Sequence, residues 1–265
     1  MRFGICGSMV ARQPDGSGAE IVEQVRELGY DYIELSLAHL AALPEDEFAA
    51  LRRRVQSSGL ACEACNNFFP RAVRLTGAEV SWDQVREYTR RAVGRAAGLG
   101  VQVIVFGSSA AKNVPAGFPF YLAWQQIVTT LRIAASEVKP LGITIAIEPL
   151  NRQESNIVNS VAEGLALMQR VNRPEVRLLA DYYHMALEQE DPAILLQAGP
   201  DLRHVHFARV AGRSFPLEVD DGFQPFFTAL RAAGYNGRVS VESFSNDFYR
   251  EAARALEVLQ QLAPA

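Results

Sequence analysis

Lysine is the scarcest charged residue in this sequence, because only Lys112 and Lys139 occur among the 26 basic residues. Neither lysine stands in a strand-like apolar run, which disfavours an enzyme whose Schiff-base lysine projects from a strand. The chain also has no Lys/Arg-rich run, and its net charge is −4. Because nucleic-acid binding normally needs a basic face, we expect no nucleic-acid partner.

Long apolar runs are missing as well. No stretch approaches the roughly 20 apolar residues that span a bilayer, and the segment "MRFGICGSMVARQPDG" lacks the apolar core of a signal peptide. The three cysteines are odd in number and lie in apolar segments, which indicates a reducing compartment rather than a disulfide framework. We therefore expect a cytoplasmic protein with no membrane partner.

Two of these cysteines form the motif "CEAC", whose spacing also occurs in zinc and redox sites. On a regular strand, residues i and i+3 point to opposite faces. We therefore expect Cys62 and Cys65 to be two separate thiols of the core or the pocket, with Cys65 as a candidate substrate contact.

Apolar segments recur regularly along the chain. Strand-like runs begin near residues 2, 31, 60, 101, 143, 177, 203 and 238, and a helical pattern fits into each interval. One of these helices opens with the capping box Ser81-x-x-Gln84. Eight strand–helix units in 265 residues match a (β/α)8 TIM barrel. We predict an α/β fold with one such barrel domain over residues 1–265, and the alternative is a doubly wound sheet.

Side-chain alternation directs polar residues of four strands to one end of this barrel. In "ITIAIE" the isoleucines share one face, and Thr144, Ala146 and Glu148 share the other. If the large aliphatic residues face the helices, Glu148 points inward at the C-terminal end of its strand, where barrel active sites lie. The same reasoning directs three more residues inward: Asp181 of "VRLLAD", His206 of "HVHFA" and Glu242 of "RVSVES".

These four residues form an oxygen-rich set with one imidazole. Three neighbouring carboxylates repel one another and shift their pKa values unless a cation holds them. Such a set suits Mn²⁺, Mg²⁺ or Co²⁺ better than a structural zinc, which prefers thiolates and several histidines. We predict one divalent cation, no organic cofactor, and the metal ligands Glu148, Asp181, His206 and Glu242.

The segments "IEPLNRQES", "ADYYHM", "HVHFARVAGR" and "VSVESF" resemble the xylose isomerase-like barrel superfamily, in particular its ketose 3-epimerases. The resemblance implies a sugar substrate, Mn²⁺ as the expected ion, and a homodimer or homotetramer. It also implies that Glu148 and Glu242 are catalytic. One glutamate removes the proton beside the ketone to give a cis-enediolate, and the other returns a proton on the opposite face.

The same resemblance implies that Glu154, His184 and Arg213 contact the substrate. The segment after the third strand adds two candidates from their chemistry. Asn67 can pair with sugar hydroxyls, and Phe69 can stack on the apolar face of a sugar, although both residues also suit a turn and its anchor. The segments after strands seven and eight lack a Gly-rich phosphate nest, which favours a free sugar over a sugar phosphate.

Other functions remain open for this set of residues. Return of the proton to the adjacent carbon gives an aldose–ketose or hydroxypyruvate-type isomerase, and loss of water after proton removal gives an inosose or dehydroshikimate dehydratase. A non-catalytic sugar-binding barrel is the remaining alternative, although it would not need both glutamates. A DNA-repair nuclease of the endonuclease IV type is disfavoured, because its zinc site needs more histidines than the four in this chain.

Overall fold

The computed structural model describes residues 1–263, so the last two residues of the predicted domain lie outside the described part of the chain. Eight parallel strands follow one another around a closed barrel, and the last strand pairs with the first. The predicted TIM barrel is therefore confirmed. The strands are β1 (Arg2–Cys6), β2 (Tyr32–Ser36), β3 (Ala61–Asn66), β4 (Val103–Phe106), β5 (Thr144–Ile147), β6 (Val176–Asp181), β7 (Leu202–Phe207) and β8 (Arg238–Val241).

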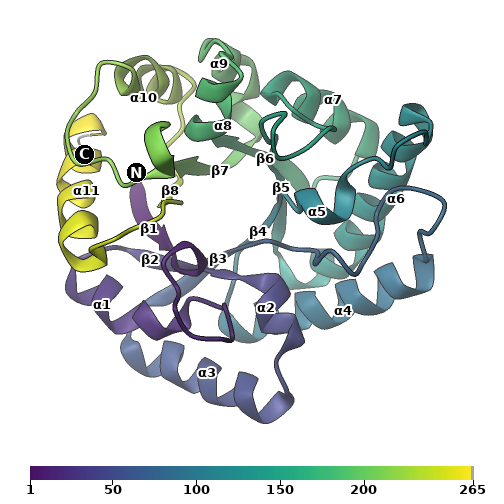
Figure 1. Cartoon of the computed structure of the whole chain (residues 1–265), viewed down its shortest axis with the longest axis horizontal. Helices are drawn as coiled ribbons and strands as arrows, with labels where there is room; N and C mark the ends of the chain where they lie inside the picture. The colour runs from purple at the N-terminus through teal and green to yellow at the C-terminus, as the bar shows by residue number, and fades with distance from the viewer. Residues whose placement is uncertain (264–265) are drawn as a thin grey trace.

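Helices surround this barrel on all sides (Figure 1). Ser81 caps one of the longest of them as predicted, since its hydroxyl accepts a hydrogen bond from the backbone N–H of Gln84. No helix within residues 1–263 is both long and apolar enough to cross a bilayer. The helices are α1 (Val22–Glu27), α2 (Leu37–Ala42), α3 (Glu45–Ser58), α4 (Trp82–Leu99), α5 (Ser109–Lys112), α6 (Phe120–Val138), α7 (Val161–Val171), α8 (Tyr182–Leu187), α9 (Ile194–Ala198), α10 (Phe223–Ala232) and α11 (Phe248–Leu262).

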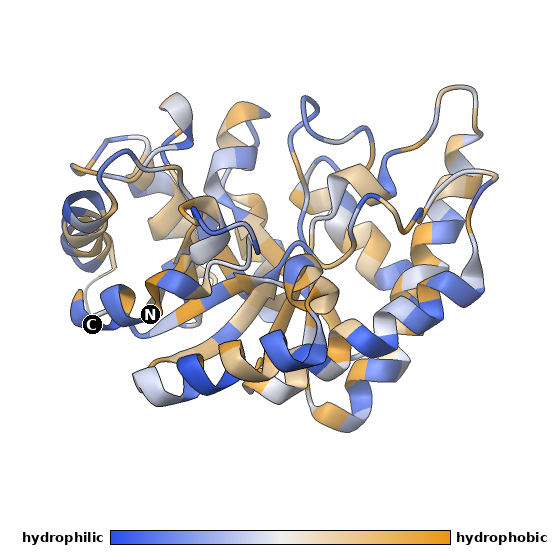
Figure 2. Cartoon of the chain, turned by 60° about the horizontal axis from the view of Figure 1, so that its bottom comes forward, coloured by the Kyte–Doolittle hydropathy of each residue, from blue (hydrophilic) through white to orange (hydrophobic). Residues whose placement is uncertain are grey.

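Most of the hydrophobic core lies between the strands and the helices. Hydrophobic colour follows the strands, whereas the helices alternate between hydrophobic and hydrophilic residues and the loops are mixed (Figure 2). The isoleucines of β5 belong to this outer core, as the alternation predicted. A separate small cluster fills part of the barrel interior and consists of Ala64, Val103, Val105, Ala146 and Leu179.

Polar side chains occupy the remaining interior in successive layers. Near the N-terminal ends of the strands, Glu63 forms ion pairs with Arg2 and Arg238. One layer higher, the hydroxyl of Tyr32 lies 2.9 Å from Ser240 Oγ. Buried charges need such partners, because an unpaired charge in a low-dielectric interior is strongly unfavourable. The layer at the C-terminal ends of the strands holds the candidate site.

The prediction that the two cysteines of the "CEAC" motif point to opposite faces of the strand is wrong. β3 contains a bulge, because its pairing with β2 advances from Cys62 directly to Ala64. The bulge changes the parity, so Cys62 and Cys65 both belong to the outer hydrophobic core while Ala64 faces the interior. Both thiols are free and buried, and burial followed by contact with Cys62 raises the pKa of Cys65.

Candidate active site

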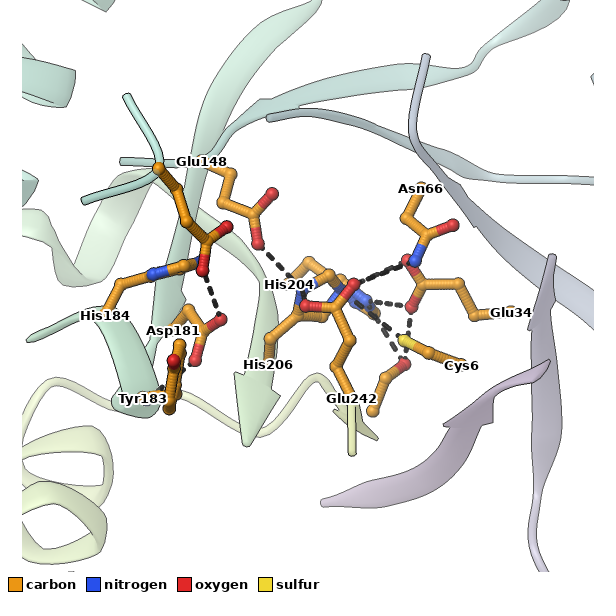
Figure 3. Close-up of polar contacts among 12 residues, drawn as sticks. Cys6, Glu34, Asn66, Glu148, Asp181, Tyr183, His184, His204, His206 and Glu242 are labelled. Carbon is orange, nitrogen blue, oxygen red and sulfur yellow. Dashed lines mark hydrogen bonds and ion pairs between the residues drawn. The ribbon is translucent and has the colours of Figure 1, made fainter. Parts of the chain in front are cut away.

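The four predicted metal ligands meet at the C-terminal end of the barrel (Figure 3). Glu148, Asp181, His206 and Glu242 each offer one ligand atom, and these atoms all lie within 4.8 Å of one another. His206 Nδ1 is 2.9 Å from Glu148 Oε1 and 3.2 Å from Glu242 Oε2. All four residues are buried, so their charges are not screened by bulk water.

Two features of this group fit a bound divalent cation. Asp181 Oδ2 is buried and has no hydrogen-bond partner among the described residues, although buried carboxylate oxygens are normally paired or bound to a cation. Next to Glu148, residue 107 is a glycine, and a Cβ there would clash with Glu148 Oε2. The glycine leaves room for the carboxylate at this position. The donor set is consistent with a metal site rich in oxygen ligands.

The carboxylate of Glu34, which is not one of the four candidate ligands, orients the imidazole of His206 from the barrel interior. Glu34 Oε1 lies 3.1 Å from His206 Nε2, and Glu34 Oε2 lies 2.7 Å from His204 Nε2. The hydroxyl of Ser240 also donates to Glu34 Oε2 at 2.6 Å. A carboxylate on the outer nitrogen of a metal-binding histidine selects its tautomer and ring orientation. Glu34 thus leaves His206 Nδ1 facing the other three ligands.

The pKa values of Glu148 and Glu242, the two candidate catalytic carboxylates, are shifted in opposite directions. Burial raises the pKa of Glu148 more than the charge and the hydrogen bond of His206 lower it, and the charge of Glu242 adds a smaller increase. Burial also acts to raise the pKa of Glu242, but the charges of His206 and Arg213 outweigh it and hold that pKa well below its usual range. Such divergence between two neighbouring carboxylates is a feature of catalytic acid–base pairs.

Glu154, His184 and Arg213 lie together on one side of the four ligands. Arg213 forms ion pairs with Glu242 and, at 3.3 Å, with Glu154 Oε1. The backbone N–H of Asn151 donates to His184 Nδ1 at 3.2 Å, so the other ring nitrogen, Nε2, carries the proton. That nitrogen is 3.4 Å from Asp181 Oδ2 but makes no hydrogen bond, which leaves a donor available to a ligand.

A pocket of about 550 Å³ opens above the group. Asn67 and Phe69 line it as predicted, together with Glu154, His184 and Arg213. Cys65 does not line this pocket, because the bulge in β3 turns its side chain into the outer core. Its predicted substrate contact therefore has no structural support.

The structure also brings to the site residues that were not among the predicted site residues. Lys112 is fully buried, and its Nζ donates to the backbone carbonyl of Glu148 at 3.3 Å. Burial lowers the pKa of Lys112 to about 8, although Glu148 and Glu154 act to raise it. Asn66 and His39 line the pocket as well. Lys112 lies outside any strand and carries no sequence signal for the site, whereas Asn66 stands beside Asn67 in "CNNFFP" and its amide suits sugar hydroxyls or a turn equally.

Three of the six non-glycine residues with a positive φ angle within residues 1–263 line this pocket. Asn67, Ser108 and Arg213 line it, and all three have positive φ angles of 50°, 43° and 46°. Non-glycine residues adopt this left-handed region at a cost, and such residues are enriched at functional sites. The loops after β3, β4 and β7 are therefore held in specific conformations around the pocket.

A closed barrel with a buried carboxylate–imidazole group at the C-terminal ends of its strands is the arrangement of a TIM-barrel active site, and the group is consistent with a metal site. Comparison with known proteins identifies the family to which the chain belongs. Residues 22–262 match the family described as xylose isomerase-like TIM barrel, and the chain belongs to that family.

Within the family, this chain is an isomerase-type enzyme similar to ketose 3-epimerases. It is 25% identical to the D-psicose 3-epimerase of Agrobacterium fabrum over 92% of this chain and 85% of that protein. It is 37% identical to the L-ribulose 3-epimerase of Methylomonas sp. (strain DH-1), but over only 45% of this chain and 42% of that protein. A D-allulose 3-epimerase structure from Methylomonas sp. in complex with D-allulose superposes with a TM-score of 0.88 at 26% identity, covering 99% of this chain and 97% of that chain.

Metal binding should be visible as a change in thermal stability. We expect Mn²⁺ at 100 times its Kd to stabilise the protein by about 2.7 kcal/mol, which raises Tm by roughly 5–10 °C for a chain of this size. Excess EDTA should reverse the rise. Asp181→Asn removes one ligand and should abolish most of the shift, and an undiminished shift in this variant would place the ion elsewhere.

The glycine beside Glu148 provides a second test. Gly107→Ala should weaken Mn²⁺ binding by about 10- to 100-fold, because the new methyl group displaces the Glu148 carboxylate. Gly94→Ala on α4 is the matched control, since a Cβ there meets no atom within 4 Å. Isothermal titration calorimetry of both variants gives the comparison, and equal Mn²⁺ affinities would show that Glu148 does not need this space.

Proposed function

We propose that this chain is a divalent-metal-dependent epimerase that inverts C3 of a free ketose. One observation carries the proposal: Glu148 and Glu242 approach the same imidazole nitrogen from β5 and β8. Two carboxylates on either side of one metal position can act on the two faces of one carbon. The similarity to ketose 3-epimerases over almost the whole chain supports the same reaction.

The cation, for which Mn²⁺ is the proposed ion, would bind the ketone oxygen and the neighbouring hydroxyl oxygen and make the intervening C–H bond more acidic. Either Glu148 or Glu242 removes the C3 proton, depending on which epimer is bound. The other glutamate returns a proton from the opposite face, which inverts the configuration. The buried positions of both side chains keep bulk water from competing for these protons.

Glu154, His184 and Arg213 are proposed to bind the sugar hydroxyls next to the reacting carbon. His184 offers its Nε2–H, and Glu154 offers a partly exposed carboxylate. Asn67 and Phe69 are proposed to contact the remainder of the sugar, since both line the pocket.

A free sugar fits this charge distribution better than a sugar phosphate. Arg213 is engaged by three carboxylates, including Asp181 at 3.6 Å, which leaves little of its charge for an anion. Arg209 does not line the pocket, but Arg71 lines its β1–β4 side, so this preference rests on the engagement of Arg213 by carboxylates. A cytoplasmic location and assembly as a homodimer or homotetramer remain predictions from the sequence.

Proton NMR in D₂O tests the reaction directly. Mn²⁺-loaded protein is incubated with D-fructose, D-allulose, D-tagatose or D-sorbose, and metal-stripped protein is the control. We expect deuterium at C3 together with the C3 epimer, only in the loaded sample. Deuterium at C1 with formation of an aldose would establish an isomerase, and loss of water from inososes or dehydroshikimate would establish a dehydratase. Turnover of phosphorylated sugars alone would exclude the free-sugar substrate.

The two glutamates can be separated by substitution. Glu148→Gln and Glu242→Gln should each lower epimerisation by at least about 100-fold, because each removes the base on one face. Each variant should still exchange the C3 proton of one epimer, and the two variants should act on opposite epimers. Mn²⁺ occupancy is measured in parallel, and Glu47→Gln on the surface of α3 is the matched control. Near wild-type epimerisation in either site variant would remove that glutamate from the catalytic pair.

A further inference from the structure

Asn66 is a buried amide beside one of the two proposed catalytic glutamates. It is the last residue of β3, only 5% of its surface is exposed, and it lines the pocket. Its Nδ2 donates a hydrogen bond to Glu242 Oε1 at 2.9 Å (Figure 3). The reverse orientation of the amide would place Oδ1 against the carboxylate, so this hydrogen bond determines which way the amide faces.

Asn66 Oδ1 is left without a hydrogen-bond partner by this orientation, as judged from residues 1–263. A buried acceptor that stays unpaired is unfavourable, so a partner from outside the chain is expected. The cation is not that partner, because the cation position and Asn66 lie at different oxygens of Glu242. Oε2 faces the candidate ligand His206 Nδ1 at 3.2 Å, whereas the amide of Asn66 is bonded to Oε1. A substrate hydroxyl, which can donate a hydrogen bond, has the required chemistry.

The distribution of the pocket lining indicates which hydroxyl this is. On the β5–β8 side, Glu154, His184 and Arg213 crowd together with the metal ligands. Most of the remaining lining belongs to the segments that follow β1 to β4, including Ser8, His39, Asn67, Arg71 and Ser108. A ketohexose has one carbon on one side of its ketone and four on the other. Its longer arm therefore fits the β1–β4 side, which contributes most of the lining and to which Asn66 belongs.

We propose that Asn66 Oδ1 accepts a hydrogen bond from the C4 hydroxyl of the ketose and thereby selects substrates. This inference rests on the proposed function, in which the oxygens of C2 and C3 go to the cation. The C4 hydroxyl is then the nearest hydroxyl of the longer arm that is still free. Because Nδ2 of the same amide holds Glu242, Asn66 links a substrate hydroxyl to the group that acts on C3.

A ketose without the C4 hydroxyl tests the proposal. Mn²⁺-loaded wild type and Asn66→Leu are each titrated with D-fructose and with 4-deoxy-D-fructose by calorimetry, and turnover of both sugars is followed by NMR. Wild type should bind D-fructose about 10- to 100-fold more tightly than the deoxy sugar, because the deoxy sugar leaves a buried acceptor unpaired. In Asn66→Leu the two affinities should agree within about threefold. The kcat/KM values should follow the same pattern.

Two further variants separate recognition from structural effects. Ser109→Ala removes a pocket hydroxyl to which the proposed function gives no role, and it should preserve the preference for D-fructose. Asn66→Ala replaces Asn66→Leu if the leucine variant does not fold. A role of Asn66 limited to holding Glu242 would lower turnover of both sugars equally and leave the affinity ratio at its wild-type value.

The outcomes distinguish this inference from the proposed reaction. An affinity ratio that depends on Asn66, without any C3 epimer, would support the hydroxyl contact and exclude the epimerase. Epimer formation with the same affinity ratio in wild type and Asn66→Leu would exclude the hydroxyl contact and keep the epimerase. Failure of the loaded wild type to bind either sugar would overturn both proposals.

Discussion

Negative charge buried at the mouth of the barrel is the constraint on which the site depends. Glu148, Asp181 and Glu242 lie within a few ångströms of one another and are shielded from water. Such a group is unfavourable unless cations and hydrogen-bond donors compensate it. Arg213 supplies one positive charge from the β7–α10 loop, and buried Lys112 supplies another below Glu148. A divalent cation would supply the remainder, in keeping with the Asp181 oxygen that has no hydrogen-bond partner within residues 1–263.

The barrel keeps this arrangement in place. Each of the four ligands lies at or just beyond the C-terminal end of a strand whose outward side chains pack against helices. Beneath them, Glu34 joins His204 and His206 in one hydrogen-bonded layer. Ligands on rigid strands, supported by a second layer, lose little conformational freedom when substrate binds. The strained loops at Asn67, Ser108 and Arg213 then shape the pocket around a rigid centre.

The mouth of the barrel is divided into two chemically different halves. The β5–β8 half carries the ionic groups around Glu154, His184 and Arg213. The β1–β4 half is lined mainly by neutral polar and apolar residues, together with Arg71. Charges beside the reacting carbon suit proton transfer, whereas neutral amides and hydroxyls suit the recognition of sugar hydroxyls. Asn66 lies at the boundary, since it touches Glu242 and lines the pocket.

The count of eight strand–helix units was sufficient to predict the barrel, and side-chain alternation was sufficient to direct the four candidate ligands into it. Glu148, Asp181, His206 and Glu242 could be identified because regular strands turn every second residue inward, whatever lies around them. The strand starts were correct within two residues for the same reason. The family resemblance indicated Glu154, His184 and Arg213, and the structure brings these residues to the same mouth.

Tertiary structure decided the features that depend on neighbours in space. The bulge in β3 arises from its pairing with β2 and moves Cys65 out of the pocket, which no local pattern encodes. Lys112 and Asn66 reach the site from segments distant in sequence from Glu148 and Glu242, respectively. The sequence by itself thus determined the fold class and the four candidate ligands through the repeat of strand–helix units and local periodicity. Only closure of the barrel determined which charges are compensated and which buried polar atoms have no partner within residues 1–263, because both depend on contacts between distant strands.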